Sequence, residues 1–128
     1  MVACFALTAL LAGCELKYYY NVVNQTNDTL RLEMSADNTP HQSQIFTLLP
    51  RRKELIYLDV DRGNWSRTPT DEFEKSPDMS LPPRSKVKIY EGERLLSDEL
   101  LFRKHWEYKI VNQAGIYTLN ITDELLKL

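Results

Sequence analysis

The 128-residue chain is poor in the side chains from which metal sites and nucleophilic active sites are usually built. It holds two cysteines, Cys4 and Cys14, both near the N-terminus, and two histidines, His41 and His105. Zinc sites are assembled mostly from several Cys and His side chains. No Gly-x-Ser-x-Gly or His-Glu-x-x-His motif occurs, and no spacing singles out a pair among the 18 acidic residues. We therefore expect neither an enzyme nor a metal site.

Neither sign of charge dominates, and no apolar run is long enough to cross a bilayer. The 16 Lys and Arg residues nearly balance 18 Asp and Glu residues, whereas nucleic-acid-binding domains usually carry a basic excess. The apolar stretch over residues 1–11 is far shorter than the ~20 residues of a membrane-spanning helix. A hydrophobic content of 43% is typical of one globular domain. We expect no nucleic-acid partner.

The uncharged N-terminal segment, residues 1–13, has the features of an export signal. An apolar region of roughly 7–15 residues before a small-residue cleavage site is typical of signal peptides. Leu11-Ala12-Gly13-Cys14 resembles a bacterial lipobox. In that signal the small Ala12 and Gly13 leave the following bond accessible to the peptidase, and the thiol and amine of Cys14 are acylated. The motif predicts a lipoprotein signal peptide and a covalent lipid on Cys14, without any other cofactor.

This prediction has consequences for the rest of the chain. Cleavage before Cys14 removes 13 of the 128 residues and leaves one cysteine, so no disulfide forms within the mature protein. Two or more acyl chains anchor a protein stably to a membrane surface, and residues 14–16 are the expected tether. No Lys or Arg precedes the apolar region, so we expect translation to start upstream of Met1. An ordinary secretory leader or a buried N-terminal helix is the alternative.

Beyond the tether, apolar and polar residues alternate with a period of two. Leu30, Leu32 and Met34 share one face of such a segment, while Arg31 and Glu33 share the other. This alternation is typical of half-buried antiparallel strands. Strands are expected over residues 17–23, 29–35, 44–49, 55–60, 95–102, 106–110 and 117–121, with a further one around 86–89.

The turns between these segments favour a sandwich. Turn residues at 25–28, 91–93 and 113–115 separate the strands. Seven or eight short strands with such turns predict an all-β, antiparallel, immunoglobulin-like β-sandwich over residues 17–128. The likeness is one of architecture, because the paired cysteines of antibody domains are missing. The tail, 123–128, is expected to form one helical turn with Thr122 as N-cap.

One connection, residues 61–84, is too long for an ordinary turn and shows no period. Loops of this length inside a compact domain are usually functional or disordered. It carries Trp65, Phe73 and Met79 among polar residues. An exposed Trp65 or Phe73 would stack on a sugar or anchor a protein partner. The alternative is that these side chains cover an open edge of the sandwich as a flap.

Other charged segments carry weaker signals. Residues 59–64 resemble a calcium loop superficially, but Gly63 occupies a ligand position, so we expect a solvated acidic loop. The basic clusters at 51–53 and 103–105 lie at expected strand corners. They either meet anionic lipid head groups near the anchor or form solvated turns.

Several segments together resemble a known group of proteins. They are the lipobox, the strand–turn–strand over 20–24 and 28–30, Pro50 after a mid-chain strand, Trp106-x-Tyr108, and the ending over 117–125. These features are similar to small cell-envelope lipoproteins of the Bacteroidota, a group without an agreed activity. The resemblance implies a sandwich fold and a location in the cell envelope.

The same resemblance bears on modification and on the side of the membrane. In that phylum O-glycans are attached at Asp-Ser/Thr before an apolar residue, and Asp28-Thr29-Leu30 fits this pattern. Surface export there is associated with acidic residues soon after the lipidated Cys. Glu15-Leu16-Lys17 lacks such a run, so we expect the outer membrane with the domain facing the periplasm.

We therefore expect a non-enzymatic, membrane-anchored lipoprotein whose sandwich binds another envelope protein. The long loop or an exposed strand edge would form the contact, the edge by strand addition. The alternative is a glycan-binding module that stacks sugars on loop aromatics, Trp65 and Phe73, or on the tyrosines at 18–20.

Overall fold

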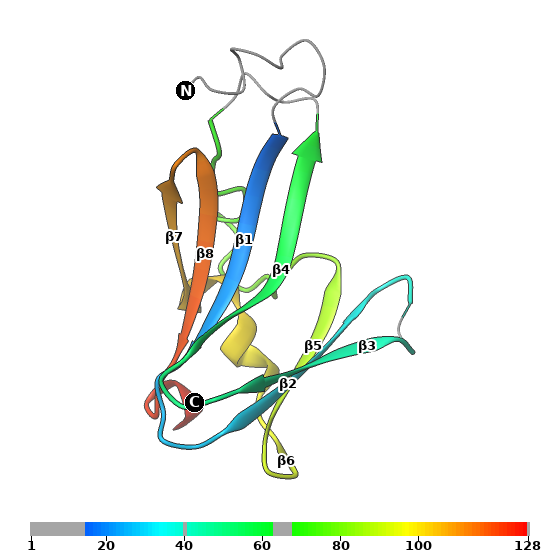
Figure 1. Cartoon of the computed structure of the whole chain (residues 1–128), viewed down its shortest axis with the longest axis vertical. Coiled ribbons are helices and arrows are strands. Elements are labelled where there is room, and N and C mark those ends of the chain that lie inside the picture. The colour runs from blue at the N-terminus through cyan, green and yellow to red at the C-terminus, as the bar shows by residue number, and fades with distance from the viewer. Residues whose placement is uncertain (1–14, 40, 63–67, 128) are drawn as a thin grey trace.

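The computed structural model describes residues 15–39, 41–62 and 68–127, which form two four-stranded sheets packed against each other (Figure 1). Sheet A has the order β4-β1-β8-β7, and sheet B has the order β3-β2-β5-β6. The strands are β1 (Glu15–Asn24), β2 (Leu30–Ala36), β3 (Ser43–Leu48), β4 (Lys53–Arg62), β5 (Ser85–Glu91), β6 (Arg94–Leu95), β7 (Trp106–Val111) and β8 (Ala114–Ile121).

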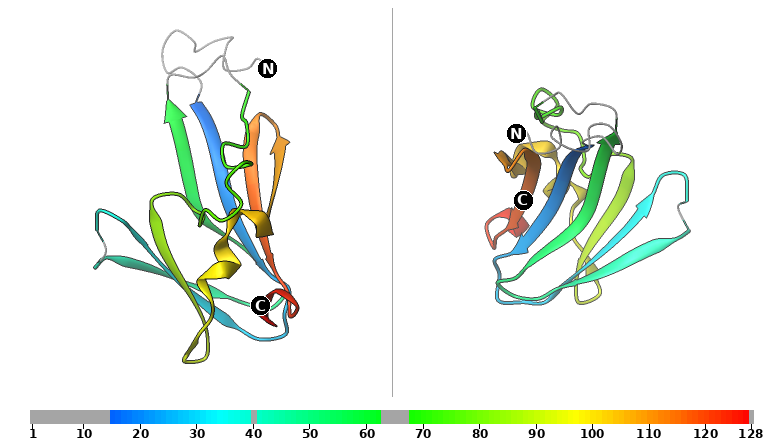
Figure 2. Two further views of the ribbon diagram at one scale, coloured as in Figure 1. Left: turned by 180° about the vertical axis from the view of Figure 1, so that it is seen from behind. Right: turned by 45° about the horizontal axis from the view of Figure 1, so that its top comes forward.

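This two-sheet architecture confirms the predicted all-β sandwich of seven to eight strands. Neighbouring strands are antiparallel, except that β1 and β8 run parallel. Figure 2 shows sheet B packed across the lower part of sheet A, while the upper part of sheet A extends beyond it. Strand β1 lies centrally in sheet A, and β2 and β5 lie centrally in sheet B.

The core lies between the sheets and follows from the alternation of the strands. In β1 every second residue from Leu16 to Asn24 is buried, and β8 repeats the pattern through Ile121. Leu30, Leu32 and Met34 of β2 supply the facing side chains. Burying one such aliphatic side chain stabilises the fold by about 1.5–3 kcal/mol, so the period-two pattern is itself the main source of the fold's stability.

A buried polar turn carries the chain from sheet A to sheet B. The Asn24 side chain donates from Nδ2 to the carbonyl oxygens of Asp28 and Leu48, at 2.7 and 2.8 Å. Its Oδ1 accepts from the Thr26 amide and hydroxyl, at 3.0 and 2.7 Å. Asn24 and Thr26 are fully enclosed, and such groups are stable inside a core only when they are hydrogen-bonded.

The predicted strand over 95–102 is wrong. Strand β6 ends at its second residue, and a 3-10 helix, η1 (Asp98–Leu101), follows it. Ser97 caps this helix by accepting a hydrogen bond from the Glu99 amide at 3.0 Å. Leu100 and Leu101 point into the core. The cap and the two buried leucines outweigh the strand-like composition, and the segment crosses from sheet B to sheet A.

Two further short 3-10 helices complete the described chain, η2 (Arg103–His105) and η3 (Leu125–Lys127). The Leu125 amide donates to Thr122 Oγ1 at 3.1 Å, which confirms the predicted capped turn at the C-terminus. Among the residues that the structure describes, no helix is long and apolar enough to cross a membrane.

Candidate functional site

The described part of the long connection, residues 68–84, packs against the sandwich. It runs along the side of sheet A that faces sheet B (Figure 2, left). Leu81 is completely buried, and Pro69, Pro82 and Pro83 are buried with it. We call residues 68–84 the flap. The expectation that the loop side chains cover an open edge is met only in part, because the flap lies on a face of sheet A and Met79 stays exposed.

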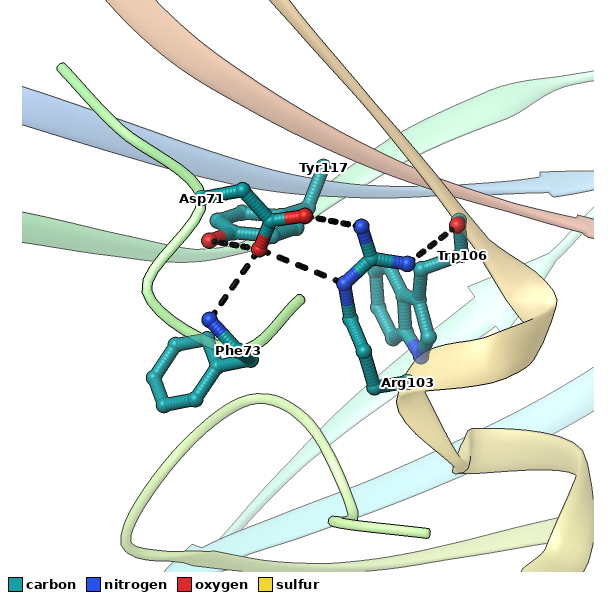
Figure 3. A network of polar contacts seen from close by, with 5 residues as sticks. All are labelled: Asp71, Phe73, Arg103, Trp106 and Tyr117. Carbon is teal, nitrogen blue, oxygen red and sulfur yellow. Dashed lines mark hydrogen bonds and ion pairs between the residues drawn. The ribbon is translucent and has the colours of Figure 1, made fainter. Parts of the chain in front are cut away.

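An ion pair fastens this flap to η2, and a hydrogen bond fastens it to β8 of sheet A (Figure 3). The guanidinium of Arg103 binds the Asp71 carboxylate with two nitrogens. Asp71 also accepts from the Tyr117 hydroxyl at 3.0 Å and from the Phe73 amide at 3.1 Å, and Arg103 donates to the Trp106 carbonyl at 2.8 Å. The two charged side chains are only 11% and 14% exposed. The network therefore joins the loop, η2 and β8 inside the fold.

The hydrogen bonds of this network set the ionisation of its members. Burial alone would raise the pKa of Asp71, but the bonds from Arg103, the Phe73 amide and Tyr117 outweigh it and hold that pKa below its usual range. The hydrogen bond to Asp71 raises the pKa of Arg103. Both groups are therefore charged at neutral pH, and their charges satisfy each other.

A cluster of aromatic rings lies beneath the flap. Tyr20 and Tyr117 stack with ring centroids 4.7 Å apart, Tyr108 lies 4.7 Å from Tyr117, and Trp106 meets Tyr20 edge-on at 5.9 Å. Burial raises the pKa of Tyr108 to about 12. Tyr18 and Tyr20 are only 4% and 1% exposed. The expected sugar-stacking platform is therefore wrong for these two residues, because their rings form the core.

Of the two aromatic residues predicted as loop contacts, Phe73 lies within the described residues and Trp65 does not. Phe73 is half-buried, and its ring centroid lies 6.1 Å from that of Tyr117, so it packs against the core. Trp65 lies outside the described residues, as do Leu11 to Cys14 with the predicted lipidation site. Met79 remains 42% exposed.

The predicted O-glycosylation site lies on the surface. Asp28 and Thr29 are exposed, and the next residue, Leu30, begins β2 and is buried. The threonine hydroxyl is therefore accessible in the folded domain, while the apolar position of the motif belongs to the core.

Residues of both basic clusters form hydrogen bonds or ion pairs within the fold, whereas we expected lipid contacts or solvated turns. Arg51 donates to the Gln25 carbonyl at 2.9 Å and to Asn27 Oδ1 at 2.8 Å. Arg103 is held by Asp71, and Lys104 lies 3.5 Å from Asp78. Because one arginine of each cluster braces a turn or the flap, neither cluster presents three unengaged cations to a membrane.

The acidic segment that resembles a calcium loop is partly inside a strand. Asp59 and Asp61 belong to β4 and are half-buried, while Gly63 and Asn64 lie outside the described residues. Within the described ranges there is no group of three or more His, Cys, Asp or Glu side chains placed to hold a metal ion.

Part of the exposed apolar surface of sheet A lies on its outer side. Leu55 and Leu58 of β4 are 44% and 43% exposed. Leu58 lies opposite Tyr19 of β1, and Tyr19 lies opposite Ile116 of β8, so the three side chains form one cross-strand row. Val60 extends it along β4. We call Tyr19, Leu55, Leu58, Val60 and Ile116 the outer apolar face.

Sequence reasoning missed this face, although a signal for it existed. Residues 55–58 are four consecutive apolar residues, Leu-Ile-Tyr-Leu, so a strand there has apolar side chains on both sides. The pairing of β4 with β1 shifts by one residue at Tyr20 and Asn21. Ile56 therefore enters the core while Leu55 and Leu58 point outward.

The chain matches no known protein family, no curated protein and no solved structure.

Proposed function

We propose that the chain is a non-enzymatic lipoprotein of the bacterial cell envelope, anchored through Cys14, whose sandwich binds another envelope protein through the outer apolar face. The observation that carries this proposal is the row of Leu58, Tyr19 and Ile116 on the surface of sheet A. A contiguous apolar patch on the surface of a folded domain often marks a site of interaction with another molecule.

The residues around this face favour a protein partner over a lipid surface. Lys53, Glu107 and Lys109 line one hollow together with Ile116 of this face, and all three are exposed. A rim with both signs of charge around an apolar centre is typical of protein interfaces. A surface that binds anionic lipid would carry basic residues alone.

The position of β1 in the chain supports the proposed lipid anchor at Cys14. The strand begins at Glu15, the residue directly after Cys14. A lipid on that cysteine would hold the sandwich against the membrane, because a tether of one or two residues reaches at most ~3.6 Å per residue. From the sequence resemblance we place the domain on the periplasmic side of the outer membrane, and exposed Thr29 is the proposed glycan acceptor.

Site-specific photo-crosslinking in living cells tests the interaction. A photoreactive phenylalanine analogue at Leu58 is expected to yield one discrete adduct with an envelope protein. The matched control is the same analogue at Ile45, which is 63% exposed on β3 in the other sheet. Absence of an adduct from Leu58, or equal adducts from both positions, would contradict the proposed interface.

A further inference from the structure

We infer that the sandwich has a second contact site, the open edge of β5, which accepts an extended segment of a partner protein with alternating acidic and apolar residues. The segment adds to sheet B as a strand. This inference rests on the proposed function, since it names the chemistry of a partner for the interaction domain.

The register of sheet B leaves part of β5 without a neighbour. Strand β5 pairs with β2 from Ser85 to Tyr90, but with β6 only at its last two residues. The Leu96 amide donates to the Ile89 carbonyl at 2.8 Å, which shows that the backbone groups of Ile89 point away from β2. In an antiparallel ladder alternate residues point the same way. The N–H and C=O groups of Ser85 and Val87 therefore face the open edge, where no described strand pairs with them.

A groove with an apolar floor runs along this edge. Its volume is about 300 Å³, and it separates β5 from Ser80 and from η1. Leu81, Val87 and Leu101 form the floor and are at most 9% exposed. Unpaired backbone groups beside an apolar pocket are the two features by which strand addition gains affinity and specificity. One apolar side chain of an added strand would point into this floor beside Val87.

The charges at the groove determine the side chains that flank this apolar residue. Lys86 and Lys88 lie on either side of Val87 and are both exposed on the outer surface. Neither forms an ion pair with a described residue. Glu33, which lies opposite Lys88, binds Arg31 instead, and the residue opposite Lys86 is the uncharged Ser35. Opposite charges at directly facing positions stabilise strand pairs. The two lysines therefore select acidic residues at the positions before and after the apolar one.

The opposite wall of the groove fixes how the segment lies. Asp98 of η1 lines this wall and repels an acidic side chain placed there. The acidic residues of the partner therefore lie on the β5 side, over the lysines, and the apolar residue turns inward.

Peptide binding tests this inference with the purified full chain. The probe is a fluorescein-labelled peptide of alternating glutamate and valine, compared by anisotropy with the same peptide carrying lysine in place of glutamate. The glutamate peptide is expected to bind about ten-fold more tightly or better, because like charges at facing positions are strongly unfavourable. Hydrogen exchange at the Val87 amide is expected to slow when the peptide binds.

Charge reversal on the protein supplies the matched variants. Lys86→Glu with Lys88→Glu is expected to weaken binding of the glutamate peptide by about ten-fold or more. The double variant should then bind the lysine peptide more tightly than the glutamate peptide. Lys75→Glu with Lys127→Glu makes the same change in net charge at exposed positions outside both proposed contact sites, and is expected to leave binding unchanged.

Three results would overturn the inference. They are no binding of the glutamate peptide up to ~1 mM, equal binding of both peptides, or binding that leaves the Val87 amide unprotected. None of them would affect the anchor at Cys14 or the adduct from Leu58, so this site and the proposed function can fail separately.

Discussion

Asp71 shows how one side chain can decide the path of a long connection. Its carboxylate is the only described acceptor that holds Arg103, Tyr117 and the Phe73 amide together. A buried ion pair gains little when its desolvation outweighs the Coulomb attraction, but here additional hydrogen bonds satisfy both partners. The network therefore fixes residues 68–84 on the sandwich and keeps the aromatic cluster covered.

Replacing Asp71 by Asn is expected to destabilise the protein by about 3 kcal/mol, because it leaves the enclosed Arg103 cation without a counter-charge. Urea unfolding measures the change. The control is Asp78→Asn, which removes a 3.5 Å ion pair between side chains that are 51% and 74% exposed, and should cost at most about 1 kcal/mol. Equal effects of the two substitutions would show that the network does not hold the flap.

His105 and Asp71 give the stability two separate dependences on pH. Burial, with the nearby Lys104, lowers the pKa of His105, whose Nε2 is buried and meets no hydrogen-bond partner in the described ranges. As the pH falls through about 6.5, the unfolded chain gains this proton before the folded one does, so stability falls. The pKa of Asp71 is lowered as well, and the stability that it contributes is lost only below about pH 4.

The urea midpoint, measured from pH 8 to pH 3, is therefore expected to fall in two steps. His105→Gln should remove the upper step and Asp71→Asn the lower one. A midpoint that stays constant between pH 7 and pH 5 in the original protein would contradict the role assigned to His105.

At the scale of strands and turns, the sequence predicts the elements better than their pairing. Seven of the predicted strands are present, and alternation predicted β2, β5, β7 and β8 among them, because buried and exposed residues take turns along a half-buried strand. The parallel pairing of β1 with β8, with Tyr20 opposite Tyr117, joins residues almost a chain length apart. Local patterns carry no information on such contacts. The strand prediction for residues 95–102 was wrong because a short 3-10 helix and a short strand can bury the same apolar residues. Composition alone does not separate the two.

The candidate sites were less predictable, for related reasons. Asp71 and Arg103 look like ordinary solvated charges in the sequence, and only the fold brings them together across 32 residues. The open edge of β5 depends on where β6 ends, and therefore on the segment that was predicted wrongly. The outer apolar face depends on the register shift between β1 and β4.

The turn at Asn24 gives a prediction at this scale. Asn24→Ala removes the donors to the Asp28 and Leu48 carbonyls and leaves polar groups unsatisfied, which we expect to cost about 3 kcal/mol. Thermal unfolding followed by circular dichroism measures it. Asn27→Ala, in the same turn but exposed, should change stability by at most about 1 kcal/mol. A small effect at Asn24 would mean that the crossover between the sheets does not depend on this side chain.

For the whole molecule, the two ends of sheet A have different roles in this account. Strand β1 begins and β4 ends at the same end of the sheet, since Glu15 lies opposite Arg62. The C-terminal turn and the crossover at Asn24 lie at the other end (Figure 1). An anchor at Cys14 therefore places the first end at the membrane and directs the crossover, with Thr29 beside it, away from the lipid. The outer apolar face and the β5 edge then lie on the sides, where neighbouring envelope proteins can reach them.

Intact-mass spectrometry of the protein from the membrane fraction tests whether Cys14 carries the lipid anchor. We expect a mass equal to residues 14–128 plus covalent acyl groups on Cys14. We also expect that Cys14→Ala leaves the protein unacylated and either soluble or uncleaved. An unmodified Cys14 in a protein recovered from the soluble fraction would contradict the claim, and the membrane-bound partners proposed above would fall with it.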